Sequence, residues 1–364
     1  MQNESLLPRP KSATIFYVIA TIFLVITALI YFDSIIKPIV IALFIWFVIS
    51  QLKISIRKIK IGGKSVSILG SNIIAFIIIV LCMYLGGELL IRNIEGLAKS
   101  MPEYVANLDR TYADVSLLIN NPIYADYVKK GMNELNLIEL APDFINSFSG
   151  TLANLAVVII YVIFFIMEDA SNKVKLNLLF LVKGEKYERF NYQLNQISGS
   201  IRSYIWSKTV ISLITAVISY VILVIMKVDY AFFWSFLVFI LNFIPYLGPA
   251  ISSTLPAVFA AIIFDDLIKF VYVFAALGSV QAILGNFVEP KIMGKGTNLS
   301  PVSVLVSIAF WGMIWGVVGM ILAVPVMAVV VIVLSQIKAS RFMAILLSEK
   351  AGIPDLVSKE ALLE

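Results

Sequence analysis

The feature that most constrains this chain is a succession of long apolar runs. A helix needs about 20 mainly apolar residues to cross a hydrocarbon layer of roughly 30 Å. Only helices and closed barrels pair every backbone N–H and C=O group inside such a layer. The sequence therefore predicts an all-α polytopic membrane protein with about eight membrane segments. These segments fall at about residues 13–32, 35–52, 68–90, 150–167, 207–226, 230–264, 267–288 and 302–337.

Composition supports this fold class and excludes several kinds of chemistry. The 364 residues are 60% hydrophobic and 14% charged, whereas soluble domains are about 45–50% apolar and about 25% charged. The chain has no histidine and one cysteine, Cys82, which removes zinc sites, serine–histidine triads and an intramolecular disulfide. Basic residues lie in short runs beside apolar spans, unlike a nucleic-acid footprint. We expect no enzymatic activity, cofactor, metal site or nucleic-acid partner.

The basic residues between the apolar runs predict the orientation in the membrane. Cytoplasmic loops carry an excess of Lys and Arg. Residues 53–64 contain five basic and no acidic residues, and residues 168–208 contain seven basic and four acidic residues. Residues 91–149, by contrast, contain five basic and eight acidic residues. We therefore expect both termini in the cytoplasm, residues 91–149 outside, and a location in the inner membrane of a bacterium.

Two polar segments contain apolar stripes with helical spacing. In the outer segment, Ser100 and Glu103 have the spacing of a capping box with Pro102 in the first turn, which predicts that a helix begins there. That segment fits either a small packed cap or a ligand-collecting domain. In the inner loop, apolar residues recur at steps of three and four from Tyr187 to Tyr204. We expect a helix parallel to the membrane plane; a contact between subunits and packing on the bundle are the alternatives.

The apolar run at 230–264 is interrupted between Asn242 and Pro249, where two prolines and a glycine fall within eight residues. Proline removes a backbone donor and glycine loosens a helix. Such a break survives in a membrane only inside protein or beside a water-filled cavity. The two arms of about 15 residues are about 22 Å long, which is short for full spans. The pattern favours a re-entrant hairpin.

The run at 302–337 is interrupted by Gly312, Gly316 and Gly319 and contains Pro325 in its second arm. Two interpretations are open. The glycines could form the tip of a second hairpin, or Gly312 and Gly316 could form a small-xxx-small pair that lets helices approach closely. With the first break outside and the second inside, the two interruptions would enter the membrane from opposite sides.

Interrupted segments of this kind are the best sequence indication of a transporter's binding site. Polar residues late in the connecting span would complete such a site, because amides can both donate and accept hydrogen bonds. The candidate pathway residues are Asn242, Pro245, Tyr246, Gly248, Pro249, Gln281 and Asn286.

Charged residues at the ends of membrane segments are candidates for ion coupling, because ionisable groups inside membranes often mark pathways. Glu88 lies near the outer end of its span, where it could simply extend to the interface. Glu289 and Lys291 lie near the cytoplasmic end of the next-to-last run, where they could form an end cap or a surface pair.

These spans and loops divide the chain into five parts. Three spans are followed by an extracytoplasmic helical segment, and then by two spans with a cytoplasmic amphipathic helix. A transport unit with the two broken hairpins follows, and the chain ends in a cytoplasmic tail. The five parts cover residues 1–90, 91–149, 150–226, 227–337 and 338–364.

Three motifs of the C-terminal half resemble those of the autoinducer-2 exporter (AI-2E, or PerM-like permease) family. They are NFIPYLGP at 242–249, QAILGNFVEPKIMGKGTNLSP at 281–301 and GMIWGVVGMILAVP at 312–325. The resemblance covers nearly the whole chain. It implies a multi-pass inner-membrane protein with re-entrant hairpins, a pentameric homo-oligomer and an elevator-like movement of the C-terminal half. It also implies export of autoinducer-2 or, as in related members, sodium (lithium)/proton antiport.

Three functional hypotheses follow. The first is an exporter of a small polar molecule like autoinducer-2, embedded in the lipid bilayer. The second is a cation/proton antiporter, which requires a carboxylate that titrates inside the membrane; Glu88 and Glu289 are the candidates. The third is a membrane scaffold without transport activity, which would leave the broken helices with polar tips unexplained.

The predicted orientation can be tested by cysteine labelling in a Cys82→Ser background. A cysteine that replaces Ser116 should react with a membrane-impermeant maleimide in intact cells, because residues 91–149 are expected outside. A cysteine that replaces Ser65 should react only after permeabilisation. The reverse pattern would refute the orientation of the whole chain.

Overall fold

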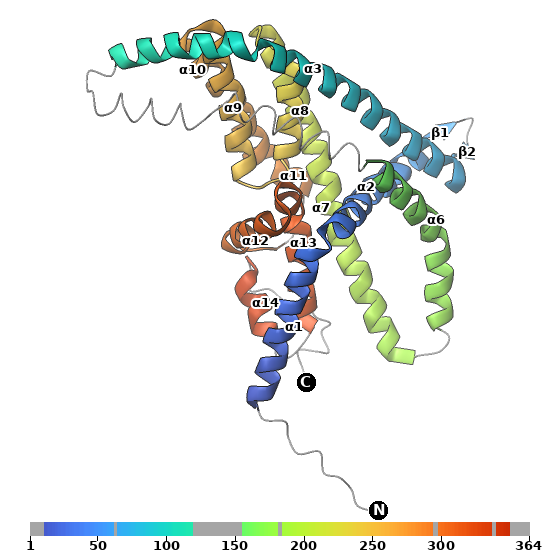
Figure 1. The fold of residues 1–364 in the computed structure, drawn as a ribbon. Coiled ribbons are helices and arrows are strands. Elements are labelled where there is room, and N and C mark those ends of the chain that lie inside the picture. Colours follow the sequence, from blue (N-terminus) through green and yellow to red (C-terminus); the bar gives the residue numbers. More distant parts are fainter. Residues whose placement is uncertain are drawn as a thin grey trace, which may run out of the picture.

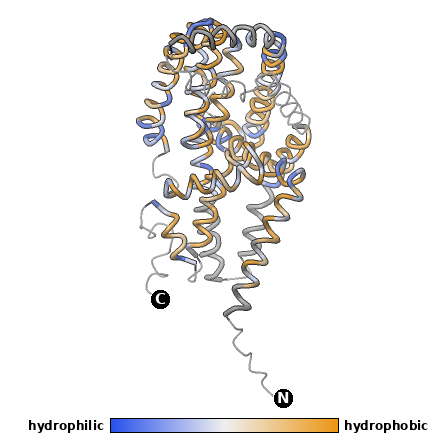
Figure 2. Tube along the Cα trace, turned by 60° about the vertical axis from the view of Figure 1, so that its left-hand side comes forward, coloured by the Kyte–Doolittle hydropathy of each residue, from blue (hydrophilic) through white to orange (hydrophobic). Residues whose placement is uncertain are grey.

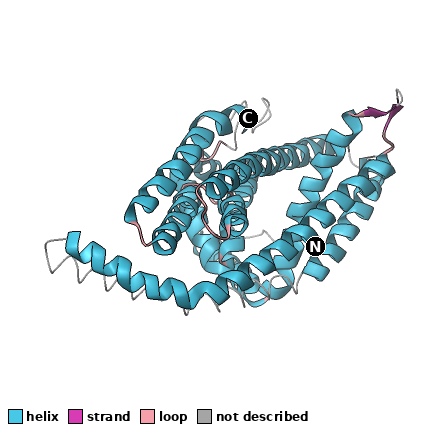
Figure 3. Cartoon of the chain, turned by 90° about the horizontal axis from the view of Figure 1, so that it is seen from above, coloured by secondary structure: helices cyan, strands magenta, loops and turns pink. Residues whose placement is uncertain are grey.

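The computed structural model describes residues 11–61, 64–118, 155–180, 184–293, 298–336 and 340–349. These residues are almost entirely helical (Figure 3), which confirms the predicted all-α class. The exception is a small antiparallel ribbon between β1 (Lys60–Ile61) and β2 (Lys64–Ser65), which pairs Lys60 with Ser65.

The N-terminal half consists of long helices. They are α1 (Lys11–Tyr31), α2 (Asp33–Lys58), α3 (Ile68–Leu118), α6 (Leu155–Phe180) and α7 (Gly184–Ile225). The C-terminal half consists of shorter helices (Figure 1). They are α8 (Ala231–Leu241), α9 (Leu247–Phe264), α10 (Leu267–Ile283), the π-helical turn η1 (Leu284–Val288), α11 (Glu289–Met293), α12 (Pro301–Trp315), α13 (Val317–Gln336) and α14 (Arg341–Leu347).

Hydrophobic residues follow the helices along most of their length (Figure 2). Six stretches within the described helices are long and apolar enough to cross a membrane: Asp33–Lys58, Ile68–Leu97, Ser198–Ile225, Leu247–Phe264, Leu267–Ile292 and Val317–Ser335. Four shorter apolar helical stretches accompany them: Ile19–Tyr31, Ala156–Glu168, Ala231–Leu241 and Pro301–Trp315. Each of the eight predicted runs overlaps at least one of these helices. The chain is therefore a polytopic helical membrane protein.

Two predicted boundaries are wrong, because helices continue through them. α3 is one helix of 51 residues, so Ser100 and Pro102 lie inside it and do not begin a new helix. The stripe from Tyr187 to Tyr204 is helical as expected, but it belongs to α7, which is continuous for 42 residues. That helix includes the candidate span Ser198–Ile225. The stripe therefore extends the spanning helix and is not a separate helix in the membrane plane.

Both broken runs form helix–turn–helix pairs, as predicted, but their arms are unequal. α8 has 11 residues and α9 has 18, while α12 has 15 and α13 has 20. In each pair the first arm is short, and the second is long enough to be a candidate span by itself. The expectation of two arms of similar length in the first pair is therefore wrong.

Helix α7 contributes to two of the three apolar clusters. Leu223 of α7 lies in the cluster formed with α3, α8, α9 and α10. Tyr204 and Ile205 lie nearer the other end of α7, in the cluster with α2, α12, α13 and α14. The third cluster joins α2, α3 and α6. Helix α7 therefore connects the two broken helix pairs.

The far part of α3 is fixed to the turn between α7 and α8. The Oγ atom of Ser100 lies 2.8 Å from the hydroxyl oxygen of Tyr230, and the hydroxyl group of Tyr104 donates to Asp229 at 3.1 Å. Burial raises the pKa of the Tyr104 phenol above its usual value. A Cβ atom on Gly96 would lie 2.7 Å from the Tyr230 ring. Gly96, Ser100 and Tyr104 are four residues apart, so they form one face of α3 against this turn.

A larger side chain at Gly96 should weaken this contact. We expect Gly96→Leu to lower the free energy of unfolding by about 1–3 kcal/mol, because the new side chain would overlap Tyr230. Gly86→Leu on the same helix is the matched control, since its Cβ would meet nothing within 4 Å. The midpoint of thermal unfolding in detergent micelles checks both variants. Equal midpoints would show that α3 does not hold the turn.

Candidate functional site

The break between α8 and α9 is a tight, hydrogen-bonded turn. The amides of Asn242, Phe243 and Ile244 donate to carbonyls three or four residues earlier, at 3.0, 3.2 and 2.8 Å. On the other side of Pro245, the amides of Leu247 and Gly248 donate to Pro245 and Ile244. These backbone N–H groups are therefore satisfied by carbonyl groups of the same segment.

Gly248 makes this turn sterically possible. A Cβ atom at this position would lie 1.8 Å from the carbonyl oxygen of Leu241, so no other residue fits without moving the backbone. Tyr246 has a φ of 63° and is 57% exposed, while Pro245 and Pro249 are half-buried. The motif thus places a narrow corner at the end of α8.

Asn242 is the buried polar residue of the corner. It is 3% exposed, and its Nδ2 atom donates to Oγ of Ser212 on α7 at 3.2 Å. Ser212 belongs to a buried polar stripe on that helix. Its members recur at steps of four, three and four residues, which is one helical face: Lys208, Ser212, Thr215 and Ser219.

Gln281 occupies a second contact between an amide and a hydroxyl group. Its Nε2 atom donates to Oγ of Ser252 on α9 at 3.0 Å, so it joins the end of α10 to the second arm of the broken pair. Asn286 lies in the π-helical turn η1 and is exposed. The structure therefore assigns Asn242 and Gln281 to two different contacts, on α7 and on α9.

Glu289 begins α11 directly after the π-helical turn and forms an ion pair with Lys208. Their Oε1 and Nζ atoms are 2.6 Å apart, and the side chains are 21% and 5% exposed. The predicted surface pair with Lys291 is wrong, because Lys291 is exposed and Glu289 turns toward α7. Loss of one partner from a buried pair costs roughly 3–5 kcal/mol, since the other charge stays buried.

Sequence reasoning missed Lys208, which it counted with the cytoplasmic loop. The spacing of Lys208 with Ser212, Thr215 and Ser219 was the available signal, because it marks a polar face inside an apolar helix. The stripe was overlooked because serine and threonine hardly lower the average hydropathy of such a run.

Glu88 lies in a different environment from Glu289. Its Oε1 atom is 2.6 Å from Nη2 of Arg92, one helical turn away, and the side chains are 43% and 72% exposed. An exposed pair of this kind contributes at most about 1 kcal/mol. Glu88 is therefore a residue of the outer surface of α3, separate from the polar stripe on α7.

In the second broken pair, the three glycines have distinct positions. Gly316 forms the turn between α12 and α13 with a φ of 64°, which favours glycine. Gly312 packs against Met320, and a Cβ atom on Gly319 would lie 1.9 Å from the carbonyl oxygen of Trp311. Gly316 therefore forms the tip of the hairpin, while Gly312 and Gly319 allow close packing of its two arms.

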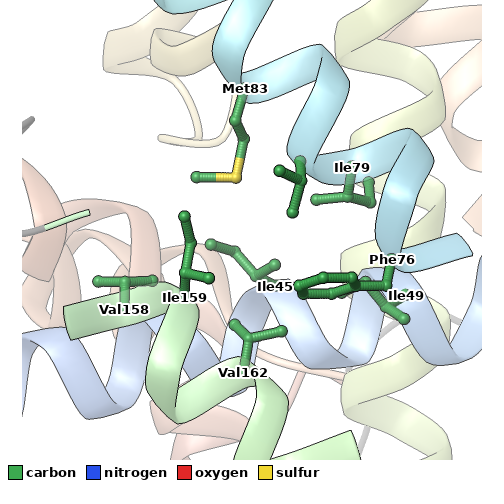
Figure 4. Close-up of a pocket in the computed structure, with 9 residues that line it drawn as sticks. Ile45, Ile49, Phe76, Ile79, Met83, Val158, Ile159 and Val162 are labelled. Carbon is green, nitrogen blue, oxygen red and sulfur yellow. The ribbon is translucent and has the colours of Figure 1, made fainter. Parts of the chain in front are cut away.

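A small apolar pocket lies elsewhere, between α2, α3 and α6 (Figure 4). Isoleucine, valine, phenylalanine and methionine side chains line it, among them Ile45, Phe76, Met83 and Val158. No polar side chain among its lining residues could hold a polar solute. We therefore place the candidate site at the broken helices and the polar face of α7.

The model of the AI-2E family transporters matches residues 15–339. The chain belongs to the AI-2E transporter family. It is 27% identical to the AI-2 transport protein TqsA of Escherichia coli K12 over 87% of this chain and 90% of that protein. It is 25% identical to a provisionally named transport protein of Borreliella burgdorferi over 92% of this chain and 90% of that protein.

The corner of this AI-2E transporter should not tolerate a side chain at Gly248. Gly248→Ala should reduce the yield of folded protein severalfold, because its methyl group would overlap the carbonyl oxygen of Leu241. Gly285→Ala, in the π-helical turn, is the control, since its Cβ would meet nothing within 4 Å. Size-exclusion chromatography of the purified variants measures the yield. A normal profile for Gly248→Ala would contradict the tight corner.

Proposed function

We propose that this AI-2E transporter exports a small, neutral, hydroxylated solute such as autoinducer-2 across the bacterial inner membrane. The observation that carries the proposal is the pair of amide–hydroxyl contacts beside the first break. Asn242 bonds to a serine hydroxyl on α7, and Gln281 bonds to one on α9. A polyhydroxylated solute presents the same chemical group as these serines, so it can replace them on either amide.

The burial of these contacts supports selectivity for an uncharged solute. Asn242, Ser212 and Ser252 are 3% exposed or less, so water competes little for their hydrogen bonds. An amide offers two donors and an acceptor, and the contact of Asn242 with Ser212 uses one donor. A site with these groups can hold hydroxyl groups in several orientations without any charge. The name of the relative TqsA, an AI-2 transport protein, supports the same solute class.

The proposal includes the form of movement. The two helix pairs, α8–α9 and α12–α13, would shift as an elevator-type unit within a homo-oligomer, with α7 as the contact between them. Helix α7 packs in the apolar clusters of both pairs. Its polar stripe would give the moving amides alternative hydroxyl partners.

A second candidate function is cation/proton antiport, and one observation favours it. Glu289 is a carboxylate paired with a buried lysine of a membrane-crossing helix. Intramembrane pairs of this kind often mark ion or proton pathways. Glu88, the other sequence candidate, is an exposed neighbour of Arg92, so it contributes little to this function.

Transport assays distinguish the two functions. In proteoliposomes loaded with autoinducer-2, Asn242→Leu and Gln281→Leu should each lower the initial efflux rate up to about tenfold, because each removes a hydrogen bond worth about 0.5–1.5 kcal/mol. Asn93→Leu is the control, since the Asn93 amide is exposed on α3. Oligomer size should stay unchanged. If both amide variants export normally while sodium/proton exchange depends on Glu289, antiport is the function.

A further inference from the structure

The ion pair of Lys208 and Glu289 joins two candidate membrane spans. Lys208 lies in the stretch Ser198–Ile225, three to four residues from its midpoint, and Glu289 lies near the end of the stretch Leu267–Ile292. The Nζ and Oε1 atoms are 2.6 Å apart, and the lysine side chain is 5% exposed. The charge of Lys208 is therefore buried within an apolar helix and depends on Glu289 for its partner.

The net charge of this ion pair determines whether it is stable in a low-dielectric environment. An ionised Glu289 and a protonated Lys208 sum to zero, and a neutral pair can stay in a low-dielectric environment. A proton on Glu289 would leave the lysine charge unpaired, which hydrocarbon strongly disfavours. The protonated form is therefore stable only where water reaches the pair.

The surroundings add few other charges. On α7, Tyr204 lies one turn before Lys208 on the same face, and Arg202 adds a positive charge. On α11, Lys291 is exposed. The titratable groups of α10, Lys269 and Tyr272, lie at the other end of that helix. When a proton binds to Glu289, the quantity that changes is therefore the net charge of the Glu289–Lys208 pair.

Two local features allow Glu289 to change partner. The Tyr204 side chain is buried, lies within electrostatic range of Glu289, and its hydroxyl group has no hydrogen-bond partner in the described part of the chain. The amide of Glu289 donates to Leu284, five residues earlier, which is a π-helical bond. A change to the α-helical bond would rotate Glu289 by about 100° around the helix axis. A turn of this type thus offers a second position for the carboxylate.

We propose that Glu289 is the proton-binding residue of the transport cycle, that Lys208 is its counter-ion, and that the helix pairs shift only while this ion pair is net-neutral. The proton adds to a carboxylate oxygen of Glu289 and is released from it on the side where water has access. The inference rests on the proposed transport function and deepens it, because it makes transport depend on pH through one identified site.

Four forms of the chain should then have different pH profiles of autoinducer-2 efflux. The wild type is neutral when Glu289 is ionised, so its efflux should fall as pH decreases. Lys208→Met is neutral only when Glu289 is protonated, so its efflux should rise as pH decreases. Glu289→Gln keeps a lone lysine charge and should lose activity on the order of a hundredfold. The double variant carries no charge at this site and should transport independently of pH.

Glu88→Gln is the matched control, because it removes a carboxylate from an exposed pair on α3; its profile should match that of the wild type. A pH-independent wild type, or a double variant that retains the wild-type profile, would overturn the proposal. The proposal would also be overturned if efflux by Lys208→Met fell with decreasing pH, as it does in the wild type. An ion pair with a purely structural role would not reverse the direction of the pH dependence.

Infrared titration of the purified chain in lipid tests proton binding without any solute. The difference between the wild type and Glu289→Gln gives the Glu289 component of the carboxyl band that appears on acidification, and the difference between the wild type and Glu88→Gln gives the Glu88 component. Lys208→Met should move the Glu289 component to higher pH and leave the Glu88 component unchanged. A Glu289 component that does not move would refute the paired proton site even if transport is normal. If the component is present but autoinducer-2 does not move at any pH, the proton site stands and the proposed solute is wrong.

Discussion

In hydrocarbon, every polar group that leaves water has to find a partner within the protein. Helix α7 meets this requirement for several parts of the molecule at once. Its buried face bonds Asn242 through Ser212 and neutralises Glu289 through Lys208. The first contact fixes the corner between α8 and α9, and the second fixes the start of α11. The positions of the surrounding C-terminal helices therefore depend on a polar surface inside an otherwise apolar helix.

The spans and the two corners could be predicted from the sequence because their causes are local. About 20 apolar residues suffice to specify a crossing helix, and Pro245, Gly248 and Gly316 act on the backbone at their own positions. The continuity of α3 and α7 could not be predicted in this way. Pro102 disfavours a helix interior, yet α3 passes through it. The contacts of Ser100 and Tyr104 on either side of it are with Tyr230 and Asp229, which are more than a hundred residues away in the sequence.

Long-range contacts limited the prediction of the candidate site. Asn242, Gln281 and Glu289 were identified by type, since polar groups in apolar runs are unusual. Their partners were not, because Lys208 is 81 residues from Glu289 and Ser212 is 30 residues from Asn242. The serines are also too common to stand out. In such chains, one residue of a polar contact can therefore be predicted from the sequence, because its type is unusual in an apolar run. Its partner can be identified only from the three-dimensional structure.

The 51 residues of α3 give this helix a length of about 77 Å along its axis. The part near its start packs with α2 and α6, and Ser100 and Tyr104 contact the turn before α8. One helix therefore couples the N-terminal bundle to the first broken pair. Any difference in the position of Tyr230 between two states of the protein would have to be accommodated along α3, although α3 and α8 are far apart in the sequence.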